Sequence, residues 1–169
     1  MFYGDSNQKT YKGRLSTEEI AKQLGLPQKE LFKNYRLPKL IAAFASYVGN
    51  DKDLEKKCVK DGSEKPRLKK FDKWQAELDY IIGEIRTRNY TDVAILLPFN
   101  DNSVKAFNNS HRNIESVKDY FDHHGVGLEC KFSDTMELNF DSELPKVMTY
   151  HSSKGLQFET VFIPFCDFP

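Results

Sequence analysis

Apolar residues recur along this chain at two spacings, one typical of helices and the other of buried strands. Between residues 74 and 85 they follow the helical period, which predicts an amphipathic helix whose apolar face joins the core. The uninterrupted apolar run 93–97 predicts a strand buried on both faces. By the same criteria we expect helices at 16–25, 38–49 and 114–125, and short strands at 67–71, 127–132, 147–150 and 160–164.

Residues that favour helix ends mark several of these boundaries. Ser16 and Glu19 have the spacing of a capping box, and Gly25 is placed to close that helix. Pro38 suits the first turn of the next helix. The polar, lysine-rich stretch 50–66 is expected to be a surface connection with one helical turn at most.

Helices that alternate with buried strands predict an α/β fold, with a mostly parallel sheet covered by helices on both faces. Ligands of such sheets bind in the loops that follow the carboxyl ends of the strands. Three polar segments occupy positions of this kind: GDSNQ after Tyr3, PFND after Leu97 and HSSKG after Tyr150.

Composition adds limits to this picture. The 169 residues are enough for one α/β domain with a substantial core, and short for two. No apolar run approaches the roughly 18 residues needed to cross a bilayer, and no secretory leader is recognisable, so we expect a cytoplasmic protein without a membrane partner. The three cysteines form no paired spacing, and we expect them to be reduced, buried and not metal-bound.

The charge balance bears on nucleic-acid binding. Net charge is zero, whereas a protein that wraps nucleic acid by itself more often carries a basic excess. Any contact with nucleic acid must therefore be local. The lysine-rich stretch 56–73 also contains acidic residues, and we interpret it as a solvated connection.

The most informative segment is 147–164, VMTYHSSKGLQFETVFIP. A strand is expected to end at Thr149, and the loop that follows holds His151, Ser152 and Lys154 before Gly155 allows a tight turn. Hydroxyl, imidazole and ammonium groups at the carboxyl end of a strand suit the binding of phosphate oxygens. The alternative is an ordinary polar turn.

This segment resembles motif V of the UvrD/Rep-type superfamily 1 helicases, T-x-H-x-x-K-G-L-E-[FWY]. The matching residues are Thr149, His151, Lys154, Gly155, Leu156 and Phe158.

Two shorter segments resemble other motifs of that family in the correct order. GDSNQ is similar to motif III, which ends the first motor domain, and the Asn-Tyr-Arg of FKNYRLPKL is similar to motif IV of the second. The resemblance covers nearly the whole chain. It implies that 1–15 is the tail of a first motor domain, and that 16–169 is a second, RecA-like motor domain without its own phosphate loop.

The resemblance also implies roles for individual residues. Gln8 would sense the γ-phosphate and Arg36 would reach it, while Tyr35 would stack on adenine. Gln157 would contact the ribose beside Gly155. Single-stranded DNA would be contacted by the remaining candidates, which are Tyr11, Thr149, His151, Ser152 and Lys154.

These side chains have the chemistry that such roles require. An aromatic ring offers any base a stacking surface. A guanidinium stays charged and presents a fork to phosphate. A glutamine amide can both donate to a phosphate oxygen and accept from water.

Departures from the family pattern limit what the chain is expected to do alone. Gln157 replaces the usual acid, and the residues after Gln8 diverge. No GxxxxGK[ST] loop or magnesium-binding Asp-Glu pair is recognisable, and motif VI would lie beyond Pro169. ATP and Mg²⁺ would therefore be cofactors of the complete helicase, with single-stranded DNA and the first motor domain as partners. The isolated chain should neither bind ATP stably nor hydrolyse it.

Two further expectations concern the extent of the chain. Only 135–145 separates the strand near 127–132 from motif V, so the family's large accessory insertion is expected to be absent. Because the chain begins at a predicted strand end and stops just after another strand, we expect it to be a piece of a longer protein.

Two other functions are compatible with the sequence. One is a non-catalytic nucleic-acid- or protein-binding module derived from a helicase domain, which the divergence at Gln157 and after Gln8 favours. The other is a small-nucleotide-binding α/β regulator, which would bind ATP tightly. At single positions, Tyr35 has the alternative of a half-buried aromatic, Arg36 of a surface charge and Gln8 of a plain turn residue.

Overall fold

The computed structural model describes residues 15–27, 32–62, 64–100, 112–133 and 135–166. The chain divides into two compact units, Met1–Leu68 and Lys69–Pro169, and each is described by itself. This division falls inside the range 16–169 that the sequence assigns to one motor domain.

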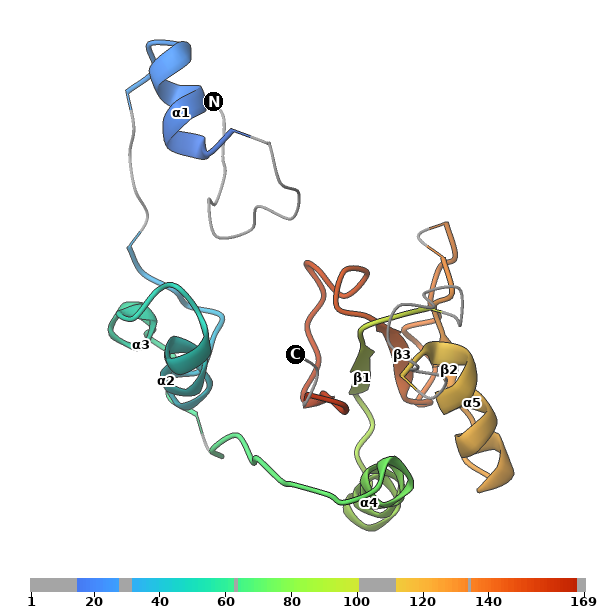
Figure 1. Ribbon diagram of the computed structural model, residues 1–169. Helices are drawn as coiled ribbons and strands as arrows, with labels where there is room; N and C mark the ends of the chain where they lie inside the picture. The colour runs from blue at the N-terminus through green and yellow to red at the C-terminus, as the bar shows by residue number, and fades with distance from the viewer. Residues whose placement is uncertain (1–14, 28–31, 63, 101–111, 134, 167–169) are drawn as a thin grey trace. The chain divides into compact units, whose positions relative to one another are not determined.

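The described part of the first unit is helical. It contains α1 (Thr17–Gln23), α2 (Lys39–Val48) and the single turn α3 (Leu54–Lys57) (Figure 1). The capping box at the start of α1 is present in full, since Ser16 Oγ accepts from the Glu19 amide and the Glu19 carboxylate accepts from the Ser16 amide. Pro38 is the N-cap of α2, one position before the first helical residue.

The described residues of the second unit form a four-stranded sheet and two helices. In chain order these are α4 (Trp74–Arg88), β1 (Val93–Leu97), α5 (Ile114–His123), β2 (Glu129–Cys130), β3 (Lys146–Thr149) and β4 (Thr160–Phe162). The spatial order of the strands is β2-β3-β1-β4, and every pairing is parallel. The α/β class and the parallel sheet expected from the sequence are thus confirmed.

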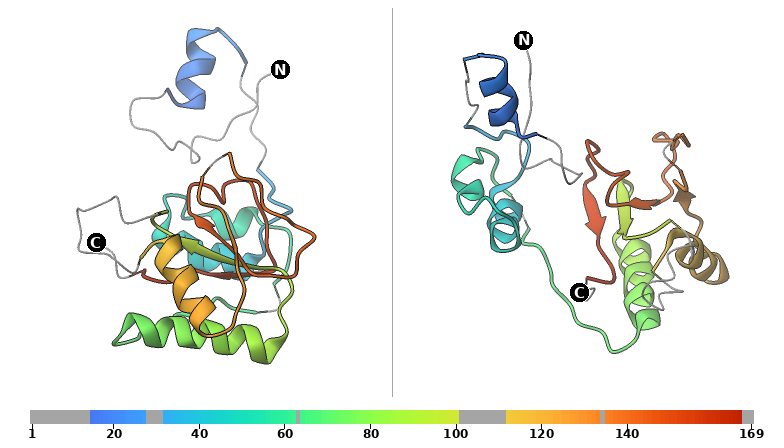
Figure 2. Two further views of the ribbon diagram at one scale, coloured as in Figure 1. Left: turned by 90° about the vertical axis from the view of Figure 1, so that its right-hand side faces the viewer. Right: turned by 45° about the horizontal axis from the view of Figure 1, so that its top comes forward.

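The core of this unit is built by both helices against the sheet. Figure 2 shows α4 and α5 running alongside the strands. Side chains alternate between the two faces of a strand, so Ile95 and Leu97 of β1 point to the same side. They and Val147 of β3 form one cluster with residues of α4 and α5, namely Leu78, Ile81, Ile82, Ile114, Val117 and Phe121.

The register aligns the carboxyl ends of the two central strands. Leu97, the last residue of β1, lies opposite Thr149, the last residue of β3. The amide of Tyr150 continues this pairing with a 3.0 Å hydrogen bond to the Leu97 carbonyl. The segment after β3 therefore begins at the middle of the sheet's carboxyl edge.

Two expectations from the sequence are wrong. Residues 67–71 form no strand, and Leu68 is 80% exposed, although the side chains of Lys69 and Phe71 contact the Tyr80 ring. Cys58 and Cys130 are buried free thiols as expected, but the free thiol of Cys166 is exposed. Among the described residues, no helix combines the length and the apolar character that crossing a bilayer requires.

Candidate functional site

The loop that follows β3 is held in shape by its own hydrogen bonds. The Thr149 hydroxyl accepts from the Ser152 amide and donates to the Ser152 hydroxyl, both at 3.1 Å. The Ser153 amide donates to the Thr149 carbonyl at 3.0 Å. Gly155 has φ +90°, a conformation that L side chains rarely adopt. We call residues 149–156 the β3 loop.

The β3 loop buries its first residue and exposes most of the rest. Thr149 is 8% exposed, and its hydroxyl shapes the loop from inside. His151 and Lys154 are exposed, as is Gln157 just beyond the loop, and Ser152 is half-buried. Imidazole, ammonium, amide and hydroxyl donors are thus gathered after one strand end, an arrangement suited to an anion such as phosphate.

A hollow of about 340 Å³ lies against the β3 loop. This volume is within the range of about 300–1,000 Å³ common for small-ligand sites. One side comes from the β3 loop and the other from the segment that connects β2 to β3. The lining residues are Lys131, Glu137, Leu138, Phe140, Ser152, Lys154 and Leu156.

Tyr150 occupies the same edge of the sheet and was not identified from the sequence. It is 44% exposed, and partial burial is the main cause that raises the pKa of its phenol to about 12. The charge of Glu77 adds to this rise in pKa, and the charge of Arg112 opposes it. Lys131 and Phe140 were also missed, because they belong to the hollow only through the path of the chain between β2 and β3.

In the first unit, a short turn presents Tyr35 and Arg36. The Asn34 side-chain oxygen accepts from the amides of Arg36 and Leu37, each at 3.0 Å. The Asn34 backbone is fixed too, by hydrogen bonds with Lys57 and Val59 at 2.7 and 2.9 Å.

The two side chains at this turn are exposed. Tyr35 is 68% exposed, which does not fit the half-buried aromatic considered above, and Arg36 is exposed as well. The turn therefore exposes an aromatic ring and a guanidinium at adjacent positions of the chain.

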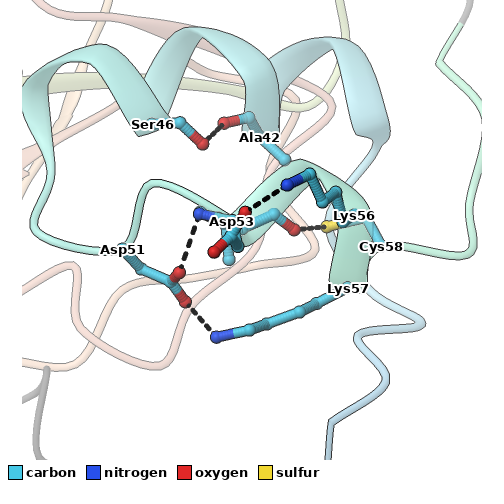
Figure 3. A network of polar contacts seen from close by, with 8 residues as sticks. Ala42, Ser46, Asp51, Asp53, Lys56, Lys57 and Cys58 are labelled. Carbon is cyan, nitrogen blue, oxygen red and sulfur yellow. Dashed lines mark hydrogen bonds and ion pairs between the residues drawn. The ribbon is translucent and has the colours of Figure 1, made fainter.

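The segment that pairs with Asn34 is stabilised by a polar network around α3 (Figure 3). Lys57 forms a 2.7 Å ion pair with Asp51, and this hydrogen bond lowers the pKa of the Asp51 carboxyl. Lys56 pairs with Asp53 at 2.5 Å. The buried Cys58 thiol donates to the Leu54 carbonyl at 3.2 Å, and burial raises its pKa. We interpret this network as support for the Asn34 turn, because Lys57 belongs to the network and its carbonyl accepts from the Asn34 amide.

The other candidate residues are distributed as follows. Gln8 and Tyr11 lie outside the described residues. Tyr35 and Arg36 belong to the first unit, and every candidate from Thr149 to Gln157 belongs to the second. In the described ranges, no three His, Cys, Asp or Glu side chains are grouped so as to hold a metal ion.

Comparison with models of protein families, with curated proteins and with solved structures finds no significant match to this chain.

Proposed function

We propose that this chain is part of an ATP-driven α/β motor that moves along single-stranded nucleic acid. More particularly, we propose a DNA helicase of the UvrD/Rep type, to which the chain would contribute a RecA-like second motor domain with helices on both faces and no phosphate loop of its own. Residues 1–15 would then end the first motor domain.

One observation carries the proposal. A loop rich in hydrogen-bond donors starts at the carboxyl end of β3, in the middle of an all-parallel sheet, and exposes His151 and Lys154. This is where ligands of parallel α/β sheets bind. The residues of this loop are also those that resemble motif V.

The candidate nucleotide contacts have suitable chemistry and exposure. Tyr35 offers a ring face for a base and Arg36 a fork for phosphate oxygens, both from a turn that Asn34 holds. The exposed Gln157 amide can accept a hydroxyl proton, although without the charge of the usual acid. When bound with Mg²⁺, ATP would supply the phosphoryl group whose transfer drives movement.

The substitution Arg36→Ala tests this role in the intact gene product. An arginine that stabilises the transferring phosphoryl group is worth about 10³-fold or more in rate. We expect DNA-stimulated ATP hydrolysis and unwinding to fall by that order, with DNA affinity little changed. Lys33→Ala is the matched control, because it removes another exposed cation three residues earlier. Wild-type hydrolysis and unwinding in the Arg36 variant would contradict the proposal.

A second candidate is a non-catalytic binding module derived from such a motor. The neutral Gln157 at the proposed ribose contact favours it. The coding sequence upstream of Met1 discriminates between the two: a phosphate loop and an Asp-Glu motif support the motor, and their absence supports the module.

A further inference from the structure

We propose that Asp61 is a site of covalent modification, at which the folded chain converts slowly and without an enzyme to isoaspartate. The reaction takes place at the bond between Asp61 and Gly62, in the segment that follows α3. It needs no reagent other than water, and the inference does not depend on the proposed function. The first unit then has two covalent forms of the same amino-acid sequence.

The reaction begins when the Gly62 amide nitrogen attacks the protonated side-chain carboxyl of Asp61. A bond forms between this nitrogen and Cγ, the amide proton and the carboxyl hydroxyl leave as water, and a five-membered succinimide results. Water then adds to one of the two ring carbonyls and breaks its bond to the nitrogen. Opening at the backbone carbonyl leaves the chain linked through the side chain, which is isoaspartate, whereas opening at Cγ restores aspartate.

The local structure leaves both reacting groups available. Gly62 has no Cβ to hinder ring closure, and glycine adopts backbone conformations that other residues rarely reach. The Asp61 side chain is 87% exposed, and neither residue belongs to a helix or strand. Among the residues that the structure describes, none accepts a hydrogen bond from the Gly62 amide. The carboxyl is therefore open to water, and regular structure does not restrain the nitrogen.

One contact opposes the reaction. The Lys39 ammonium lies 2.8 Å from a carboxylate oxygen of Asp61 and favours the charged form, which is the less reactive one. Exposed ion pairs contribute little, equivalent to about a five-fold change in an equilibrium constant at most. The two side chains are 44% and 87% exposed, so we expect this pair to slow the reaction and not to prevent it.

Asp61 lies among contacts that hold the start of α2. The Lys39 amide donates to the Lys60 carbonyl at 2.9 Å, and the Lys39 ammonium pairs with Asp61. A Cβ built on Gly62 would lie 3.0 Å from the Cβ of Pro38, so the chain passes close to that ring. Isoaspartate adds one methylene to the main chain and moves the free carboxylate. We therefore expect the modification to disturb these contacts and loosen the first turn of α2.

Asp141 and Ser142 provide an internal comparison. Serine is also a small residue, and Asp141 is exposed. Here, however, the backbone forms a hydrogen-bonded turn. The Ser142 amide donates to the Asn139 carbonyl at 3.3 Å, and the Asp141 amide donates to the Asn139 side chain at 3.0 Å. Because this turn restrains the Ser142 nitrogen, we expect Asp141 to remain aspartate.

The test incubates the folded 169-residue chain at neutral pH and physiological temperature. Peptide mapping with electron-transfer mass spectrometry then distinguishes isoaspartate from aspartate at each position. We expect isoaspartate to accumulate at position 61 and not at position 141, with an intermediate at position 61 that is lighter by one water molecule. A synthetic peptide of residues 56–66 gives the rate without the fold, and the folded chain should react within about five-fold of it.

Two variants separate the chemistry from its surroundings. Asp61→Glu keeps the charge but should form no isomer, because glutamate would have to close a six-membered ring, which is much slower. Lys39→Gln removes the ion pair and should accelerate the reaction by about five-fold at most. Circular dichroism verifies that both variants are folded. Hydrogen exchange at the first turn of α2 should become faster as the wild type ages, and should stay constant in Asp61→Glu.

Three results would overturn the inference. The first is an unmodified Asp61 in the folded chain under conditions in which the free peptide isomerises, since the fold would then protect it. The second is accumulation at position 141 as fast as at position 61. The third is an acceleration far beyond five-fold in Lys39→Gln, because the ion pair would then be sufficient to protect Asp61 in the wild type.

Discussion

At the scale of single residues, Asn113 shows how a polar side chain becomes part of a core. It is 1% exposed, and its side-chain oxygen caps α5 by accepting from the Ser116 amide at 2.9 Å. The amide of Ile114, next in the chain, donates to the carbonyls of Phe99 and Asn100, each at 3.2 Å. The cap therefore fixes the start of α5 beside the end of β1.

Loss of this cap should be measurable. We expect Asn113→Ala to lower the free energy of unfolding by about 1–2 kcal/mol, because one helix amide loses its acceptor. Asn113→Ser should retain most of the stability, since serine also caps helices well. Urea denaturation followed by circular dichroism gives the comparison. Equal stability of the alanine variant and the wild type would show that the cap contributes nothing.

Tyr120 links α5 to α4, and we expect it to make the stability of the protein depend on pH in the alkaline range. Its hydroxyl donates to the Asp79 carboxylate at 2.7 Å, and its ring stacks on His124 with centroids 4.4 Å apart. Burial, and secondly the hydrogen bond to Asp79, raise the pKa of this phenol from 10.0 to about 12. The folded protein therefore keeps the proton at pH values where the unfolded chain loses it.

The sign of the pH effect follows from that difference. Below pH 10 the phenol is protonated in both states, and its contribution to stability does not change with pH. Between pH 10 and about 12 the unfolded state binds fewer protons, so stability falls as pH rises. Urea midpoints measured across this window should fall less steeply with rising pH for Tyr120→Phe than for the wild type. Identical slopes for the variant and the wild type would refute this assignment.

At the scale of elements, two glycines separate backbone conformation from packing. Gly155 in the β3 loop has φ +90°, whereas Gly83 lies within α4. Among the described residues, no neighbouring side chain or element has an atom within 4 Å of a Cβ added at either position. Any difference in stability between their alanine variants therefore results from backbone conformation and not from packing.

We expect the two substitutions to act in opposite directions. Gly155→Ala should destabilise the protein by about 1–3 kcal/mol, because alanine is strained at this φ. Gly83→Ala should stabilise it by about 0.5–1 kcal/mol, because alanine is the better residue inside a helix. The change in urea midpoint of each variant is the measurement. Destabilisation by Gly83→Ala would contradict this expectation, because it would mean that neighbouring atoms crowd the added methyl group.

The elements also show which local sequence patterns are sufficient to predict a helix or a strand. The capping box of Ser16 and Glu19 and the apolar run 93–97 were identified correctly, because helix caps and buried strands have signals within a few residues. The strand expected at 67–71 does not form. A strand needs a partner for its backbone, and the local pattern contains no information about whether one is present.

At the scale of the whole molecule, the division into two units predicts where the chain is open to protease. Residues 64–70 are all exposed and have no regular structure. Cleavage sites for trypsin within this stretch are Arg67, Lys69 and Lys70, since Lys65 precedes Pro66 and the bond between them resists trypsin.

We expect trypsin to cut this stretch before it cuts at Arg86 or Arg88 in α4, because helical backbone must first unfold locally. Mass spectrometry of a time course identifies the sites. The C-terminal product should keep the parallel sheet, since the strands and both helices that cover it all lie after residue 70. Earlier cleavage inside α4 would contradict this division.

The sequence by itself determined the class of the fold, most helix limits and the polar loop after Thr149, because periodicity, caps and strand ends are local properties of the chain. Only the tertiary structure decided the strand order β2-β3-β1-β4, the burial of Lys146, and the meeting of Lys131 and Phe140 with Lys154 around one hollow. These features depend on the path that the chain takes between β2 and β3. That path is set by hydrogen bonds between residues of different elements, such as the bond from Asn139 to Glu129, and no local spacing encodes them.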